Sequence, residues 1–259
     1  MTTFYDLIKD LANHIADVRS STAESGTTAT LVDSLLLEPN DYYNNGTLLI
    51  DQATPLAVRI TDYASATGTF TFPTINTAIV AGVGYTAIHA KFPLDVLKRS
   101  INAALLESEL IMAVDETLAL VAGQERYALP TGVTPDVRRV EIGTEDEDNW
   151  EVHYAWKVEG GELRFIGWVP EDASKTCRIH YTKRHDELTN LTDTLDENVN
   201  RNRLIVTACK HTLIWRNYKV GKDEPNTTEL LNFYMQQAER VKNQRTSHLL
   251  ERDPLLARY

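Results

Sequence analysis

The sequence has only two cysteines, Cys177 and Cys209, among its 259 residues. They lie far apart and lack the short spacing of a metal-binding cysteine pair, so the sequence indicates no thiolate metal site. Two reduced, buried thiols are the favoured interpretation, and one disulfide between them is the alternative. A chain of this length can bury a sizeable core without such cross-links.

Long apolar runs are also missing. No run approaches the ~18 apolar residues that a membrane-spanning helix needs. The first six residues, Met1 to Asp6, show no basic start followed by an apolar stretch, so no signal peptide is predicted. We therefore expect an intracellular protein that has no contact with a membrane.

Motifs for catalysis and phosphate binding are absent as well. The seven histidines include no His-x-x-x-His pair of the kind found in zinc enzymes. His153 and His180 fall in predicted strands near Cys177, where ordinary sheet side chains are favoured over a metal or nucleophile site. Gly82-Val83-Gly84 is too short for a nucleotide fingerprint. We expect no catalytic residue, metal or cofactor; an enzyme with a dispersed site is the weaker alternative.

The chain has fewer basic than acidic residues. The chain has 26 Lys and Arg against 37 Asp and Glu, which gives a formal net charge of −11. Proteins that grip nucleic acid phosphates normally carry a basic patch, so tight DNA binding is disfavoured. An acidic surface past which DNA slides is compatible with the same charge. The densest acidic cluster lacks the ligand spacing and the glycine of a calcium loop and is interpreted as a solvated hairpin tip. It consists of Glu145, Asp146, Glu147 and Asp148.

What the sequence does contain is an alternation of helical and β patterns. Apolar residues recur every three or four positions in the first 20 residues and again from Pro93, which predicts amphipathic helices there. A weaker helix or a loop is expected from Ile111 to Val121. Between the first two helices, short alternating segments bounded by turn residues predict strands. These strands are expected at 47–50, 57–63, 68–73, 78–82 and 85–88.

These patterns predict an α+β fold. It comprises a helical bundle of about four helices, an inserted N-terminal β barrel or sandwich module, and a second antiparallel β sheet. The predicted division has helices of the bundle in 1–26 and 93–124, the inserted module in 27–92, the sheet in 125–185, the C-terminal helices in 186–250 and a C-terminal tail in 251–259.

A dense aromatic set lies in the predicted sheet. Such side chains form either a stacking platform for bases or sugars or the packed face of a sheet, and core packing is favoured. Their spacing suggests that the first three share one face of a strand. The set consists of Trp150, Tyr154, Trp156, Phe165 and Trp168.

Roughly residues 93–250 resemble the adaptor, or head-to-tail connector, proteins of the necks of tailed bacteriophages. A polar stretch followed by two terminal helices carries most of this resemblance. The matching segments are Ile101-Asn102-Ala103-Ala104, Glu125 to Pro130, Cys177 to Tyr181, Leu188 to Asp193, Ala208 with Trp215-Arg216-Asn217, and Ala238-Glu239-Arg240.

The resemblance implies a structural virion protein of the phage neck, made in the host bacterial cytoplasm. Such a protein forms a ring of about twelve copies, docked beneath the portal protein and packed side by side. The opposite face of the ring receives a tail-side stopper, tube or nozzle protein. Double-stranded DNA passes through the central channel without specific binding, and an acidic lumen, with the loop 145–148 facing the channel, would favour its sliding.

The C-terminal end is the candidate portal-binding segment. It is too short to fold alone yet carries apolar and aromatic side chains, so it is either disordered or an anchor that orders on a partner. The candidate residues are Arg252, Leu255, Leu256, Arg258 and Tyr259. The alternative function is a tail or neck binding module in which the β unit 27–92 binds a glycan or another tail protein.

Overall fold

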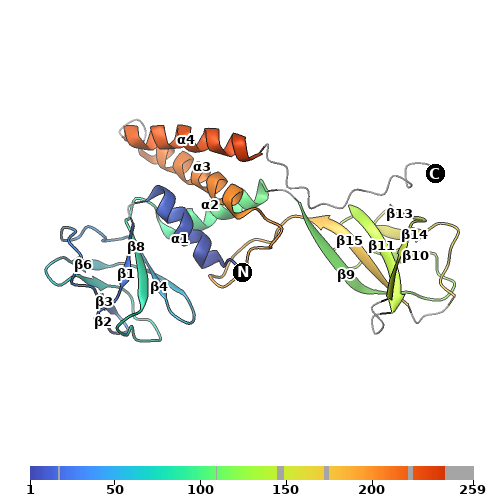
Figure 1. Ribbon diagram of the computed structural model, residues 1–259, viewed down its shortest axis with the longest axis horizontal. Helices are drawn as coiled ribbons and strands as arrows, with labels where there is room; N and C mark the ends of the chain where they lie inside the picture. Colours follow the sequence, from blue (N-terminus) through green and yellow to red (C-terminus); the bar gives the residue numbers. More distant parts are fainter. Residues whose placement is uncertain (17, 109, 145–148, 172–174, 221–223, 243–259) are drawn as a thin grey trace. The chain divides into compact units, whose positions relative to one another are not determined.

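The computed structural model describes residues 1–259 except 17, 109, 145–148, 172–174, 221–223 and 243–259. The described residues form two compact units. The first is built from 1–108 and 186–242, and the second from 110–185. Helices and antiparallel sheets are both present, so the predicted α+β class is confirmed (Figure 1). The finer division into five segments stays a prediction.

The first unit contains all helices of the described chain and eight strands. The helices are α1 (Phe4–Ile15), α2 (Leu94–Leu106), α3 (Arg201–Val220) and α4 (Pro225–Lys242). The strands are β1 (Val18–Thr22), β2 (Ser25–Gly26), β3 (Thr30–Val32), β4 (Thr47–Asp51), β5 (Leu56–Arg59), β6 (Asp62–Ala64), β7 (Thr69–Thr71) and β8 (Gly84–Ile88).

Two sets of hydrogen bonds satisfy the free N–H groups at the N-terminus of α1. Thr3 and Asp6 form a capping box, in which each side chain accepts a hydrogen bond from the backbone N–H of the other. The next free N–H groups, of Phe4 and Tyr5, donate to the carbonyls of Asp193 and Leu191 at 2.8 and 3.0 Å. The polar stretch before α3 therefore holds α1 by satisfying helix donors that would otherwise have no partner.

The strands of the first unit form two four-stranded antiparallel sheets, ordered β1-β8-β4-β5 and β2-β3-β7-β6. The sheets enclose an aromatic core in which ring centroids lie 5.0–5.6 Å apart. It includes Tyr43, Tyr63, Phe70 and Tyr85. This arrangement is a sandwich rather than a closed barrel, so of the two forms predicted for the module the sandwich is the one observed.

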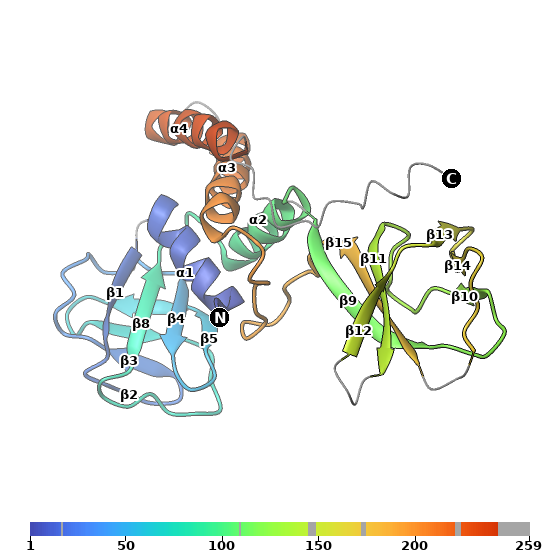
Figure 2. The ribbon, with the colours of Figure 1, turned by 45° about the vertical axis from the view of Figure 1, so that its right-hand side comes forward.

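The sheet β1-β8-β4-β5 lies between the second sheet and the helices (Figure 2). Leu48 faces the sandwich core, whereas Leu49 on the opposite face of β4 is also fully buried. Tyr5 and Lys9 of α1 reach this strand at Asp51, with the Tyr5 hydroxyl donating at 2.5 Å and the Lys9 ammonium at 3.0 Å. Burial on both faces explains why β4 is a continuous apolar run rather than an alternating one.

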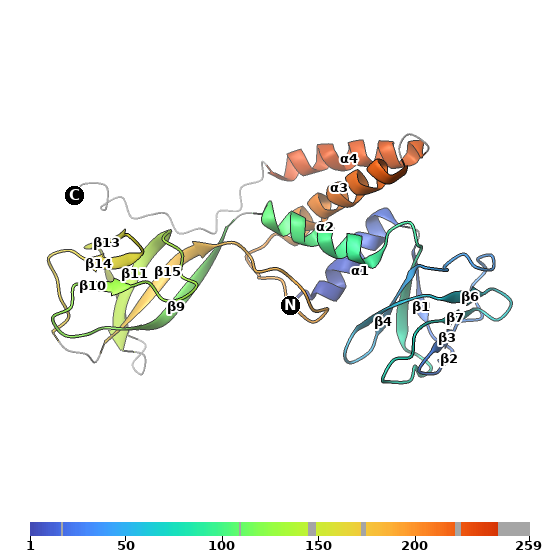
Figure 3. The same ribbon diagram turned by 180° about the vertical axis from the view of Figure 1, so that it is seen from behind.

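Helix α3 is the centre of the bundle, because it packs on α1, α2 and α4 (Figure 3). Its apolar residues therefore spread around the helix instead of forming one stripe: Leu204, Ala208 and Leu213 are all buried. Helix α4 keeps a narrow buried stripe that includes Leu231 and Tyr234, and the hydroxyl of Tyr234 lies 3.1 Å from Nδ1 of His14 in α1.

The second unit is a pair of antiparallel sheets, ordered β12-β11-β15-β9 and β10-β14-β13. They enclose one apolar core that contains Val140, Ile179 and Phe165. The strands are β9 (Ile111–Ala119), β10 (Arg126–Ala128), β11 (Val137–Thr144), β12 (Asn149–His153), β13 (Trp156–Glu159), β14 (Glu162–Phe165) and β15 (Thr176–Lys183).

Several predictions of local structure are wrong. The expected strand 57–63 is instead two strands, β5 and β6, which belong to different sheets. The first helix ends at Ile15, because Val18 to Thr22 pair with β8 as a strand. The weaker helix or loop at 111–121 is instead the long edge strand β9, which pairs with β15. Residues 78–82 form no strand and run along the sandwich as a loop, held by Ile79 N–H to Thr27 and Gly82 N–H to Ala23.

Candidate functional site

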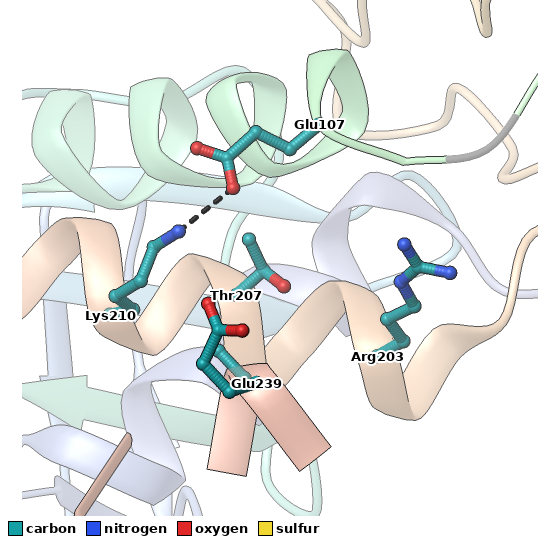
Figure 4. Close-up of a pocket in the computed structure, with 6 residues that line it drawn as sticks. Glu107, Arg203, Thr207, Lys210 and Glu239 are labelled. Carbon is teal, nitrogen blue, oxygen red and sulfur yellow. Dashed lines mark hydrogen bonds and ion pairs between the residues drawn. The ribbon is translucent and has the colours of Figure 1, made fainter. Parts of the chain in front are cut away.

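A cavity of about 390 Å³ opens between the end of α2 and the helices α3 and α4 (Figure 4). Its lining is mostly charged. It is formed by Glu107, Arg203, Thr207, Lys210, Ala238 and Glu239. Within it, the ammonium of Lys210 lies 2.8 Å from the carboxylate of Glu107, and Nε2 of the neighbouring His211 lies 2.9 Å from the same group.

The charges in this cavity stabilise one another. Burial by itself would raise the pKa of Glu107, but the hydrogen bond from Lys210 and the positive charges of Lys210 and His211 outweigh it and hold that pKa below its usual range. Burial lowers the pKa of His211 against the opposing effect of Glu107. The ion pair between Lys210 and Glu107 thus fastens α2 to α3 and occupies two of the charged groups that line the cavity.

A second charged cluster lies on the outer face of the sheet β12-β11-β15-β9. Glu141 is buried there, and its carboxylate contacts Arg139 at 2.5 Å, Nε2 of His180 at 3.0 Å and Arg178 at 3.7 Å. Arg178 also pairs with Glu116 at 2.6 Å. Alternating charges on adjacent strands make this face a closed network rather than a site with an open position.

The histidines and cysteine considered as a site are not brought together. His153 shares a register row with Val140 and Ile179 and packs on Phe165, with ring centroids 5.2 Å apart, in the core of the unit. His180 lies on the opposite face, beside the carboxylate described above. Burial raises the pKa of the Cys177 thiol to about 12, so this cysteine is not an activated nucleophile.

The aromatic set is divided as well. Trp156 and Phe165 are buried in the core, and Trp168 packs against it, as the favoured interpretation predicted. Trp150 lies instead beneath Arg178, whose guanidinium carbon is 4.0 Å from the ring centroid. The prediction that the first three residues share one face of a strand is wrong, because β12 ends at His153 and β13 belongs to the other sheet.

Exposed apolar side chains are the other conspicuous surface feature. On the bundle they include Leu106 of α2, Ile214 and Tyr218 of α3, and Phe233 and Met235 of α4. On the sandwich, Leu35 and Leu37 project from the loop between β3 and β4, on either side of the buried Leu36. The sequence did not single these leucines out, since three adjacent leucines carry no sign of which ones reach the surface.

Both groups of site residues predicted from the sequence lie outside the described residues. These are the acidic loop, Glu145 to Asp148, and the C-terminal residues Arg252, Leu255, Leu256, Arg258 and Tyr259. Among the residues that the structure describes, no group of three or more His, Cys, Asp or Glu side chains could hold a metal ion. In the same part of the chain, no helix is long and apolar enough to cross a membrane.

A comparison with protein families finds a match that covers nearly the whole chain. The model of the SU10 adaptor protein family matches residues 2–254. No curated protein matches the chain.

The chain belongs to the SU10 adaptor protein family. It is therefore a structural adaptor protein of a tailed bacteriophage and a component of the virion, and the resemblance seen in the sequence is confirmed. Membership of this family implies interaction with other head or tail proteins of the phage.

Proposed function

We propose that the chain is the subunit of a ring of about twelve copies that joins the portal protein to the tail in the virion neck. The observation that carries this proposal is the family match over residues 2–254. The ring docks on the portal with one face and receives a stopper, tube or nozzle protein with the other. The protein acts by assembly, is not an enzyme and is made in the cytoplasm of the bacterial host.

The surface of the helical bundle supports contacts between neighbouring copies. Ile214 and Tyr218 are one turn apart on α3, and Phe233 lies on the adjacent α4. Exposed aromatic and aliphatic side chains on neighbouring helices are typical of surfaces that are covered in an oligomer. In the proposed ring, these side chains pack against the bundle of the next copy.

The net charge of −11 supports a lumen through which DNA slides. A negatively charged wall repels the phosphates, so the passing duplex has no attractive contacts to break. We assign the acidic loop 145–148 to the channel-facing surface. The duplex is in transit and is not bound specifically.

The C-terminal residues are assigned to the portal. Arg252 and Arg258 supply positive charge, while Leu255, Leu256 and Tyr259 supply apolar contacts. A short segment of this composition gains order on a partner surface rather than by itself.

The test is the mass of the purified chain, alone and mixed with its cognate portal ring, measured by mass photometry. A portal ring that gains about one copy per portal subunit is the expected result. A chain lacking residues 252–259 is the matched variant, and it should bind the portal at least about tenfold more weakly. If the full-length chain stays a free monomer in the presence of the portal, the proposal of a ring is refuted. If the truncated chain binds the portal as well as the full-length chain does, only the assignment of residues 252–259 to portal binding is refuted.

A second candidate function uses the β sandwich to bind a glycan or another tail protein. Glycan sites usually expose aromatic rings to stack on sugars, whereas Tyr43, Tyr63, Phe70 and Tyr85 are buried between the sheets. The exposed leucines of the sandwich favour a protein partner instead.

A further inference from the structure

The loop after β3 presents two leucines to solvent from a fixed backbone. Leu35 is 69% exposed and Leu37 is 94% exposed, whereas Leu36 between them is 4% exposed and packs in the sandwich core. A loop that merely connected strands would gain nothing from apolar side chains at two exposed positions. Exposed apolar side chains next to one another mark a contact surface when the backbone that carries them is ordered.

Four successive N–H groups of this loop have acceptors, which are three carboxylates and one backbone carbonyl. The Glu24 carboxylate accepts from Ser34 N–H at 3.2 Å. The side chain of Asp33 accepts from Leu35 N–H at 3.0 Å, and its backbone carbonyl accepts from Leu36 N–H at 3.3 Å. Glu38 accepts from Leu37 N–H at 3.1 Å. The loop is therefore preorganised, and little conformational entropy remains to be lost when a partner covers it.

Two of these carboxylates are themselves anchored in the sandwich. The hydroxyl of Tyr85 donates to Asp33 at 2.6 Å, and that of Tyr43 donates to Glu38 at 3.1 Å. Both tyrosines belong to the aromatic core. The backbone that carries the leucines is thus connected by hydrogen bonds to the buried aromatic core of the module.

The sandwich that carries the leucines is anionic. Residues 18–88 contain six carboxylates and two cations, Arg19 and Arg59, which gives the sandwich a formal charge of −4. Such a surface repels phosphates and anionic lipid headgroups, so neither DNA nor a membrane fits it. Charge complementarity favours a partner whose apolar contact surface is bordered by Lys and Arg. The rest of this chain is anionic as well, which disfavours a second copy as that partner.

We infer that Leu35 and Leu37 form the docking tip of the β sandwich for a different virion protein, whose apolar depression is bordered by basic side chains. This inference develops the second candidate function and does not depend on the ring. The leucines enter the depression, and the accessible carboxylates beside them, Glu24 and Glu38, meet its basic border. The apolar contact supplies affinity, whereas the charges supply orientation and selectivity.

The experiment places a photo-cross-linking amino acid at position 37 of the full-length chain, in phage particles assembled with that chain. Position 53 is the matched control, because Ala53 is also exposed on the sandwich but lies in the turn between β4 and β5. Irradiation should link position 37, and not position 53, to another virion protein, at an apolar site flanked by Lys or Arg. Links only to a second copy, or equal yields at the two positions, would overturn the inference.

A double variant, Leu35→Ser with Leu37→Ser, tests whether particle assembly depends on the two leucines. The number of complete particles should fall at least about tenfold, because both apolar contacts are lost. Its unfolding midpoint and its binding to the portal ring should stay unchanged, since the two side chains contribute little to the folded core. Normal particle yields from this variant would refute the docking tip while leaving the ring proposal intact.

Discussion

The buried carboxylate of Glu141 offers a sharp test of the energetics of the second unit. Its side chain is 7% exposed, although it lies on the outer face of a sheet, because Arg139, Arg178 and His180 cover it. The substitution Glu141→Gln keeps the size of the side chain and removes its charge. Two guanidinium groups then lose an anionic partner in a partly desolvated place.

The size of the expected loss in unfolding free energy depends on how exposed the arginines that contact Glu141 are. Breaking a fully buried ion pair costs about 3–5 kcal/mol. Arg139 is 39% exposed and Arg178 is 23% exposed, so both keep access to water, and Arg178 retains Glu116. Hydrogen bonds to charged groups contribute about 1.5–3 kcal/mol. We therefore expect Glu141→Gln to lower the free energy of unfolding of this unit by about 2–3 kcal/mol.

Tryptophan fluorescence during urea unfolding of the full chain measures this loss. Three of the four tryptophans, Trp150, Trp156 and Trp168, lie in this unit, so the signal reports mainly on it. Glu116→Gln is the matched control. Its carboxylate is 39% exposed, so it should cost less than about 1 kcal/mol. A loss for Glu141→Gln no larger than that of the control would refute the reasoning.

Three further expectations follow. Leu36→Ala should cost about 2–5 kcal/mol of unfolding free energy and Leu37→Ala less than about 0.5, as urea titration would measure, because only the first side chain is buried. The hydrogen bond from Arg216 of α3 lowers the pKa of Glu224 to about 2. The contact between these two residues should therefore stabilise the fold fully above pH ~4.3, the pKa of an unfolded Glu, and lose its effect as the pH falls toward 2. Glu224→Gln should remove this pH dependence from the helical circular dichroism. Gly68 has φ +58° and a Cβ there would meet the Asp33 carbonyl, so thermal unfolding should show Gly68→Ala to be far more destabilising than Gly160→Ala, where φ is +64° but the space is open.

Local rules account for many of the elements. The apolar stripe in the first 20 residues predicts α1, and the alternation at 85–88 predicts β8. The same rules fail at β9, where Ile111 to Ala119 contains good helix formers such as Met, Ala, Glu and Leu. Pairing with β15 along nearly its whole length outweighs that preference, and no local pattern reveals such a distant partner.

The sequence by itself determined the mixed fold class, the apolar faces of the helices, the anionic character and the family. These depend on composition, on periodicity and on the order of segments, all of which are local or additive. The tertiary structure alone decided which strands share a sheet, that Glu141 is buried among cations, and that Leu36 points inward while Leu35 and Leu37 face solvent. Burial is a property of the neighbours that surround a side chain, and most of those neighbours come from distant parts of the chain.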